Sequence, residues 1–148
     1  MSSGITVTIE GYKELMQKFG DKIPTAVIEG AKNGINRAVV LVEGKATNLA
    51  PVDTGDLRHK MGFDKATISG NTATGKVYNT SDHAMYVEFG TGRRGNGSYT
   101  YPTDVTLAYK DDWAGMVAQP YLGRALHTSK EQITQLVKQY TKSAMKGL

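Results

Sequence analysis

Apolar residues recur at intervals of three and four from Ala26 to Leu49, and this is the longest regular pattern in the sequence. Such spacing places them on one face of an α-helix. Asp21 and Pro24 suit its first turn, where a side-chain cap helps and a missing N–H costs little. We therefore predict a helix from Asp21 to about Leu49, roughly 39 Å long. A helix of this length dominates whatever a chain of 148 residues folds into.

The sequence that follows the predicted helix, from Ala50 to Arg58, has the composition of a corner. Pro51 disfavours the helical conformation at Ala50, and Gly55 can take the positive φ that a tight reversal requires. Two side-chain oxygens are available to bond nearby backbone amides. The candidate corner residues are Pro51, Asp53, Thr54, Gly55, Leu57 and Arg58.

Gly30, Gly34 and Gly44 lie inside the predicted helix. Each weakens a helix by up to about 1 kcal/mol relative to alanine, so something must compensate. Close approach of another backbone is the usual reason. Packing within the chain and packing against a neighbouring subunit explain these glycines equally well.

The remaining regular patterns predict short strands. Ile5, Val7 and Ile9 alternate with polar residues, and residues 57–69 and 72–79 flank Gly70-Asn71, which favours a hairpin. Residues 84–89 also alternate and are predicted to be a strand. A short helix is expected over Tyr12–Phe19. Together the strands predict a small antiparallel sheet of three to four strands.

Periodicity disappears from Gly90 to about Asp112, which predicts a long polar loop. Structureless loops of this length are usually functional or disordered until bound. Pro120 then begins a C-terminal helix with an apolar stripe and a lysine face. The predicted fold class is α+β: a small antiparallel sheet packed by a long helix in the N-terminal half and by a C-terminal helix, with a long insertion loop. The lysine face carries Lys130, Lys138, Lys142 and Lys146.

Composition limits the possible functions. With 39% hydrophobic and 22% charged residues, the 148-residue chain is expected to form a single domain, residues 1–148, with the long loop at about 90–117. The absence of cysteine excludes disulfides and thiolate metal sites. Without a long apolar run or a signal-like start, we expect a protein made in the cytoplasm that does not enter a membrane. The net charge of +4 permits contact with nucleic acid without demonstrating it.

The sequence contains three patterns that occur in active sites, and none of them predicts an active site here. Asp53-Thr54-Gly55 matches the tripeptide of aspartic proteases, but it follows a long helix and a proline instead of an apolar strand. Gly90 to Gly95 fits the dinucleotide-binding glycine pattern, but no apolar helix opens directly after it. The acidic and histidine residues show no metal-ligand spacing and no nucleophile with an evident base. We therefore expect no catalytic residue, no metal and no cofactor. The acidic and histidine set is Asp53, Asp56, His59, His83, Glu88 and His127.

Three segments read together carry a family resemblance. They are Ala50-Pro51-Val52-Asp53-Thr54-Gly55-Asp56-Leu57-Arg58, Tyr86-Val87-Glu88-Phe89-Gly90-Thr91-Gly92, and Gln119-Pro120-Tyr121-Leu122-Gly123-Arg124-Ala125-Leu126. In this order they resemble the tail-component proteins of long-tailed bacteriophages, the small neck or tail-completion proteins that join tail to head. The segment from Arg93 to Val117 looks like an insertion relative to that family.

The resemblance implies a structural virion protein without enzymatic activity. It would form a ring that completes the tail and joins it to the capsid connector around the DNA channel. The implied partners are copies of itself in a cyclic hexamer, or alternatively a dodecamer, and the adjoining head-completion, connector, tail-terminator or tail-tube proteins. DNA would only pass through the lumen. A ring uses heterologous contacts, in which two different surfaces of each subunit meet.

Residue roles follow as expectations. Asp53, Thr54, Glu88 and Arg58 are expected to fix the corner and the strand end, while Val87 and Phe89 pack under the helices and Leu57 anchors the corner. The long loop is the candidate contact surface, because arginine and tyrosine are enriched in interfaces. The strand-end motif comprises Tyr86, Glu88, Phe89 and Gly90, and the candidate interface comprises Arg93, Arg94, Tyr99, Tyr101, Gln119, Pro120 and Tyr121.

The competing hypothesis is a basic nucleic-acid-binding protein that uses the long loop and the lysine face. Arginine and tyrosine also suit stacking on single-stranded nucleic acid. We favour a protein partner for the loop, because a protein that lines a DNA exit path gains nothing by gripping DNA. On this hypothesis the loop is mobile in the free subunit and becomes ordered against an adjoining ring.

Overall fold

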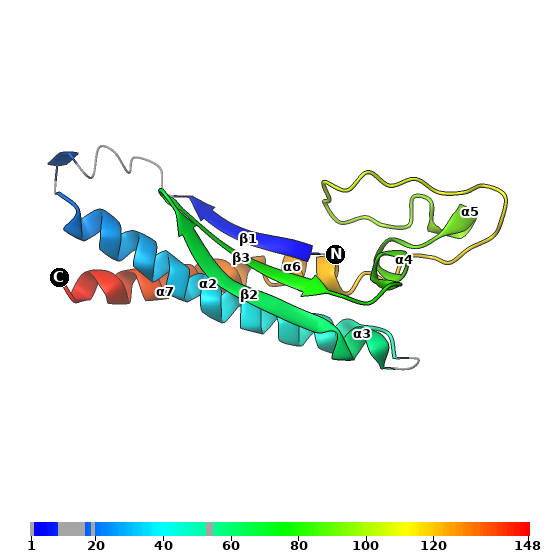
Figure 1. The fold of residues 1–148 in the computed structure, drawn as a ribbon, viewed down its shortest axis with the longest axis horizontal. Coiled ribbons are helices and arrows are strands. Elements are labelled where there is room, and N and C mark those ends of the chain that lie inside the picture. Colours follow the sequence, from blue (N-terminus) through cyan, green and yellow to red (C-terminus); the bar gives the residue numbers. More distant parts are fainter. Residues whose placement is uncertain (1, 9–16, 19, 53–54) are drawn as a thin grey trace. The chain divides into compact units, whose positions relative to one another are not determined.

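The computed structural model describes residues 2–8, 17–18, 20–52 and 55–148. Helices and strands are mixed along the chain, and the predicted α+β class is confirmed. Among the described residues, no helix is both long enough and apolar enough to cross a membrane. The elements, drawn in Figure 1, are β1 (Ser2–Thr8), α2 (Lys22–Leu49), α3 (Asp56–His59), β2 (Met61–Ser69), β3 (Thr72–Asn79), α4 (Ala84–Phe89), α5 (Gly92–Gly95), α6 (Leu122–Thr128) and α7 (Lys130–Lys146).

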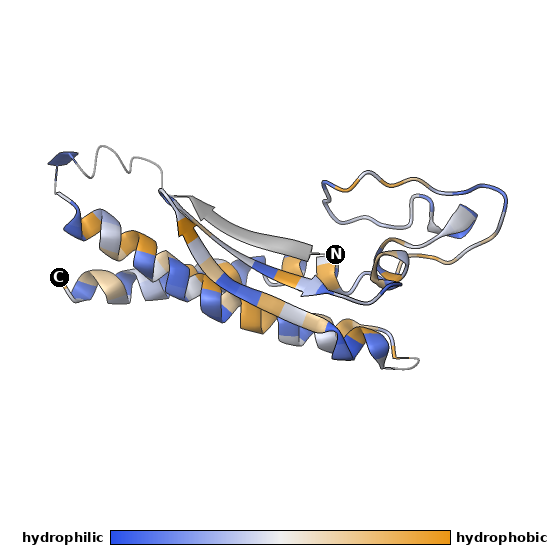
Figure 2. Ribbon diagram, in the orientation of Figure 1, coloured by the Kyte–Doolittle hydropathy of each residue, from blue (hydrophilic) through white to orange (hydrophobic). Residues whose placement is uncertain are grey.

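The long helix and the hairpin lie where the sequence predicts them. α2 covers Lys22–Leu49, and Figure 2 shows hydrophobic and hydrophilic residues alternating along it. β2 and β3 are joined through Gly70 and Asn71, and Gly70 has a φ of 59°. The sheet order is β1-β3-β2, and the arrows of neighbouring strands run in opposite directions in Figure 1. Every second residue of β3, from Ala73 to Asn79, is buried, as expected when one face is covered.

The strand predicted over Ala84–Phe89 is wrong, because these residues form helix α4. Ala84, Glu88 and Phe89 are buried while Met85 and Tyr86 are exposed, so burial recurs after four and five residues and not at every second one. Six residues with mixed polarity fit both periods, and only tertiary packing decides between them. The motif of Tyr86, Glu88, Phe89 and Gly90 therefore marks the end of a helix and not the end of a strand.

Two further boundaries differ from prediction. The segment expected to be a strand from Leu57 begins as the short helix α3, and β2 starts only at Met61. The C-terminal helix is divided into α6 and α7 at Ser129. The predicted helix Tyr12–Phe19, except residues 17–18, lies outside the described residues, and so does Ile9.

The chain divides into two compact units. Unit 1 contains mainly Val42–Gly62 and Val77–Thr128, and unit 2 contains Gly4–Leu41, Phe63–Lys76 and Ser129–Leu148. Each has buried apolar side chains of its own. Those of unit 1 include Val42, Ala46, Leu57, Val77, Phe89, Tyr121 and Leu122, and those of unit 2 include Ile28, Ile35, Ala38, Val39, Ala73 and Ile133.

In unit 2, α2 packs against both the hairpin and α7. A Cβ added at Gly75 of β3 would lie 2.6 Å from Ile35 Cγ2, so α2 rests directly on the strand. Toward α7, a Cβ at Gly34 would lie 2.7 Å from Val137 Cα, and one at Gly30 would lie 2.6 Å from Thr141 Cα. Internal packing therefore explains these two helix glycines. Gly44 has no atom within 4 Å of such a Cβ.

Alanine substitutions at two glycines of the same helix should change stability in opposite directions. Gly34→Ala forces the backbone of α7 away and should lower the free energy of unfolding by about 1–3 kcal/mol. Gly44→Ala adds a methyl group in open space and should raise it by up to about 1 kcal/mol through helix propensity alone. Urea denaturation followed by circular dichroism measures both. Equal effects of the two substitutions would contradict the close packing of α2 and α7.

Candidate functional site

The most constrained group in unit 1 is the carboxylate of Glu88, at the end of α4. Its side chain is fully buried. Oε2 accepts hydrogen bonds from the backbone N–H groups of Tyr121 (2.9 Å) and Leu122 (3.0 Å), and Oε1 accepts one from Gly123 at 2.7 Å. The Tyr99 hydroxyl donates to Oε1 at 3.4 Å. We call this arrangement the Glu88 junction.

The Glu88 junction caps the beginning of α6 with a side chain that comes from another helix. The first N–H groups of a helix have no partner within the helix, and a negative charge is favoured beside them. Burial raises the pKa of Glu88, while the three backbone donors and Tyr99 oppose that rise. A further backbone bond, from Gln119 N–H to the Val87 carbonyl at 2.8 Å, holds the two segments together. Two of the three segments noted in the sequence therefore meet here.

The long loop is folded back on itself. Thr91 and Met116 form an antiparallel bridge, and the N–H groups of Arg93 and Arg94 donate to Trp113 and Ala114 at 3.1 and 2.8 Å. The Ser98 hydroxyl accepts from Ala118 N–H at 2.9 Å. The segment predicted to be structureless therefore contains α5 and a short backbone ladder.

Glycines in the loop permit the two limbs to approach. Gly92 has a φ of 63°, and a Cβ there would lie 2.8 Å from Gly115 Cα. At Gly90, with a φ of 80°, a Cβ would lie 2.7 Å from Met116 O. The spacing that matches a dinucleotide motif thus has a packing explanation, and α5, of four residues, is no dinucleotide-binding helix.

Aromatic side chains of the loop pack inward as a chain of contacts. The rings of Phe89 and Tyr99 are 4.7 Å apart between centroids, those of Tyr99 and Tyr101 are 5.9 Å apart, and those of Tyr101 and His127 are 5.4 Å apart. The Tyr109 hydroxyl donates to the Phe89 carbonyl at 2.8 Å. Phe89 therefore packs against the loop, and Val87 is half-buried.

The candidate interface residues fall into two groups. Tyr121 is fully buried and presents no surface to a partner, and Tyr99, Tyr101 and Pro120 are half-buried. Arg93, Arg94 and Gln119 are exposed. Sequence reasoning missed a set of exposed apolar side chains nearby: Met85, Tyr86, Val105, Trp113, Met116 and Val117.

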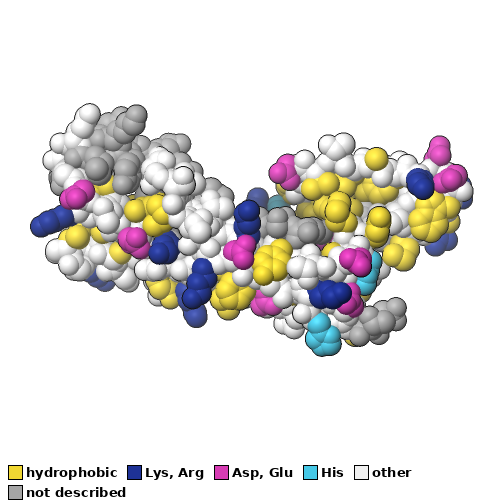
Figure 3. All heavy atoms as spheres, viewed as in Figure 1, with side chains coloured by type: hydrophobic (Ala, Val, Ile, Leu, Met, Phe, Trp, Pro, Cys, Tyr) yellow, Lys and Arg dark blue, Asp and Glu magenta, His cyan; other side chains and the backbone are white. Residues whose placement is uncertain are grey.

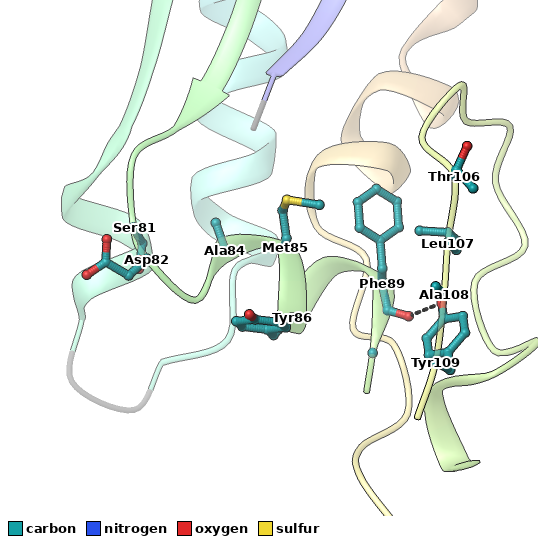
Figure 4. Close-up of a pocket in the computed structure, with 11 residues that line it drawn as sticks. Ser81, Asp82, Ala84, Met85, Tyr86, Phe89, Thr106, Leu107, Ala108 and Tyr109 are labelled. Carbon is teal, nitrogen blue, oxygen red and sulfur yellow. Dashed lines mark hydrogen bonds between the residues drawn. The ribbon is translucent and has the colours of Figure 1, made fainter. Parts of the chain in front are cut away.

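These exposed apolar residues belong to α4 and the long loop. Figure 3 shows hydrophobic side chains gathered over this part of unit 1. Beside α4 lies a pocket of about 400 Å³, the α4 pocket, formed by residues 81–82, 84–86, 89–90 and 106–109. Figure 4 shows Met85 and Leu107 on opposite sides of Phe89 in this pocket. Large contiguous apolar patches are common at the contact sites of proteins.

The corner is held by two sets of polar bonds. Arg58 donates from Nε to the Ala50 carbonyl and from Nη2 to the Asn48 carbonyl, both at 3.4 Å, and so completes the end of α2. The buried Asn79 side chain donates to the Leu57 carbonyl at 2.8 Å. Leu57 is buried, Pro51 is half-buried and Gly55 has a φ of 83°. Asp53 and Thr54 lie outside the described residues.

Asp56, Ser81 and His83 come together at this corner, a grouping that the sequence did not reveal. The Ser81 hydroxyl donates to Asp56 Oδ2, and His83 Nδ1 lies 3.0 Å from Ser81 Oγ. The serine proton is therefore directed to the carboxylate and not to the imidazole, the reverse of a hydrolytic triad. Lys60 Nζ pairs with Asp56 at 2.9 Å. The grouping serves to fasten α3 to the turn after β3.

The acidic and histidine residues of the sequence analysis are thus divided. Asp56 and His83 meet at the corner, Glu88 lies in its own junction, and His127 stacks near Tyr101. His59 is exposed at the end of α3. A weak signal for the corner existed in Asn79 and Ser81, because such residues bond nearby backbone in turns. Ser81 N–H does donate to Asn79 Oδ1 at 2.8 Å.

Glu88→Gln should destabilise unit 1. Glutamine replaces one of the two accepting oxygens of Glu88 by an NH₂ group, which is itself a donor. At least one of the buried backbone N–H groups therefore loses its acceptor. We expect the free energy of unfolding to fall by about 2–4 kcal/mol. Trp113, the sole tryptophan, reports on the loop by fluorescence during urea unfolding. Tyr99→Phe removes only the 3.4 Å bond and should cost less than about 1 kcal/mol; similar losses in both variants would refute the capping role.

The contacts of Asp56 with Ser81 and Lys60 should make the thermal stability of the protein fall as the pH is lowered. The hydrogen bond from Ser81 and the nearby Lys60 hold the pKa of Asp56 below its ordinary value of 3.8. Its ionised form therefore stabilises the folded state above that value, and the contribution disappears as the pH falls through the folded-state pKa. Thermal unfolding between about pH 5 and pH 2 should show a steeper loss of Tm in the wild type than in Asp56→Asn. Asp64→Asn, at an exposed position, serves as control and should keep the wild-type slope.

Comparison with known proteins gives one family. The family model described as "Bacteriophage HK97-gp10, putative tail-component" matches residues 13–90, just over half of the chain. The match covers α2, the corner, the hairpin and α4 with Glu88. No curated protein and no solved structure matches the chain significantly. The chain belongs to the HK97-gp10-like family of bacteriophage tail components.

Proposed function

We propose that this tail component forms a ring at the junction of head and tail, where it completes the tail and joins it to the capsid connector. The observation that carries the proposal is the exposed apolar surface on α4 and the long loop, in a chain whose family is a structural tail component. Water-exposed Met85, Tyr86, Trp113, Met116 and Val117 belong to a surface that a partner covers. In a virion the available partners are copies of the chain and adjoining rings.

The internal bonds of the loop support a role in assembly. The ladder from Thr91 to Met116 and the Glu88 junction hold the loop without a partner, so its outer residues are presented in advance. A surface organised before binding loses less conformational entropy when it docks. This arrangement suits a subunit that must meet its neighbours repeatedly and in one orientation.

In the proposed ring, DNA passes through without being bound by the chain. The lysines of α7, at positions 138, 142 and 146, are exposed at intervals of four residues and so share one face of the helix. Such a face is also an ordinary solvated one. DNA would pass through the lumen of the ring without a dedicated site in the chain.

The ring can be tested with the purified protein and with phage particles. Light scattering should give the mass of a discrete oligomer. Negative-stain class averages should show a closed ring, and its symmetry decides between six and twelve subunits. Phage that lack the protein should accumulate filled heads and separate tails, and the protein should be found by mass spectrometry in complete virions. A gel-shift series at two salt concentrations is the control, since a DNA-binding protein would lose affinity steeply as salt rises.

Two results would reject the proposal. One is a strictly monomeric protein that is absent from particles, and the other is salt-sensitive DNA binding without any ring. Removing Arg93–Tyr101 is a poor test of the interface, because Ser98 and Tyr99 bond Ala118 and Glu88 within the fold. Surface substitutions separate assembly from folding more cleanly.

A further inference from the structure

The long loop and α4 present two apolar features of opposite shape. Trp113 is 51% exposed on the returning limb of the loop, and the residues that form the α4 pocket do not include it. The pocket's exposed edge carries Met85 and Tyr86, and its volume of about 400 Å³ lies in the range that accepts a bulky organic group. An indole side chain is within that size.

Arg94 and Asp82 are residues of opposite charge beside these two features. α5 lies beside the backbone of Trp113, because the N–H groups of Arg93 and Arg94 donate hydrogen bonds to the carbonyls of residues 113 and 114. The guanidinium of Arg93 donates to the Asp111 carbonyl at 3.1 Å, whereas within the described part of the chain the exposed guanidinium of Arg94 makes no hydrogen bond or ion pair. The α4 pocket has a single charged residue in its lining, Asp82.

Nearby charges leave the Arg94 guanidinium available, while Asp111 and Asp112 place two acidic side chains on the same side as the tryptophan. Lys60 acts electrostatically on Asp82, but it is already paired with Asp56 at 2.9 Å. Asp111 and Asp112 precede Trp113, yet within the described residues neither carboxylate forms an ion pair with an arginine. One side therefore offers a tryptophan beside an available cation, and the other offers an apolar pocket with an acid.

We propose that Trp113 of one copy inserts into the α4 pocket of the next copy, with Arg94 meeting Asp82. The inference deepens the proposed function and rests on it, because it names the heterologous contact from which the ring is built. A buried tryptophan paired with arginine is typical of the centre of an interface. A single tryptophan buries only about 150–250 Å², so the exposed Met116 and Val117 extend the contact toward the area a stable interface needs.

Disulfide trapping tests the contact directly, because the chain has no cysteine of its own. Asp112→Cys beside the tryptophan and Tyr86→Cys at the pocket are made in separate chains of different tag length. After mixing and mild oxidation, the two chains should give a mixed covalent dimer. Pairs of identical chains should be scarce, since like positions do not meet in a heterologous contact. An assembled ring without the mixed dimer would overturn the inference and leave the proposed function standing.

Association measurements give a second, independent test. Trp113→Ala should raise the dissociation constant of the assembly by about 30-fold or more, as for a central interface residue. Val52→Ala, at a 60% exposed apolar position outside the loop and the pocket, should change it less than about threefold. Circular dichroism must show that both variants are folded. Unchanged assembly of Trp113→Ala would overturn the inference.

Charge reversal tests the pairing without removing the tryptophan. Asp82→Arg and Arg94→Glu should each weaken assembly by about tenfold, and the double variant should recover most of the loss. Failure of the double variant to recover would refute the Arg94–Asp82 pairing. If the wild type does not assemble at any concentration and is missing from virions, both this inference and the proposed function fail.

Discussion

Unit 1 depends on a buried carboxylate that receives three backbone N–H groups. A charge without water is costly unless every lone pair is used, and Glu88 is surrounded by Tyr121, Leu122, Gly123 and the Tyr99 hydroxyl. Because these partners are 11 to 35 residues away in sequence, one side chain fixes α4, the loop and the beginning of α6 together. The loop touches this junction through Tyr99 and is closed by its own backbone bonds between Thr91 and Met116.

A loop fixed in this way directs some side chains inward and leaves others outside. Tyr99, Tyr101 and Tyr109 contact α4, α6 or each other, so Tyr99 and Tyr101 of the candidate interface also hold the loop in place. Trp113, Met116 and Val117 remain exposed on the opposite limb. The isolated bridge between Thr91 and Met116 joins the two limbs of the loop.

Long, regular patterns were predictable, and long-range bonds were not. The spacing of apolar residues predicts α2, and Gly70-Asn71 predicts the β2–β3 hairpin. Each of these signals lies within a few residues of the sequence. α4 was misread because six residues fit a strand as well as a helix. Glu88 was expected to fix its segment, but its partners could not be named, because nothing near it in sequence indicates the amides of residues 121–123. For Asn79 and Ser81 only the local turn was indicated, and their bonds to Leu57 and Asp56, more than 20 residues away, were not.

The segments that carry the family resemblance are largely engaged in internal bonds. Arg58 completes α2, Leu57 is held through Asn79, and Glu88 joins the second segment to the third. Residues used in this way specify a fold, and they leave little chemistry for a partner or a substrate. On the proposed ring function, the contacts with partners must therefore come from residues that these segments leave exposed. Among the described residues of unit 1 the largest exposed apolar side chain is Trp113, in the loop that follows the matched residues 13–90, and loops held by a rigid scaffold are where binding residues gather.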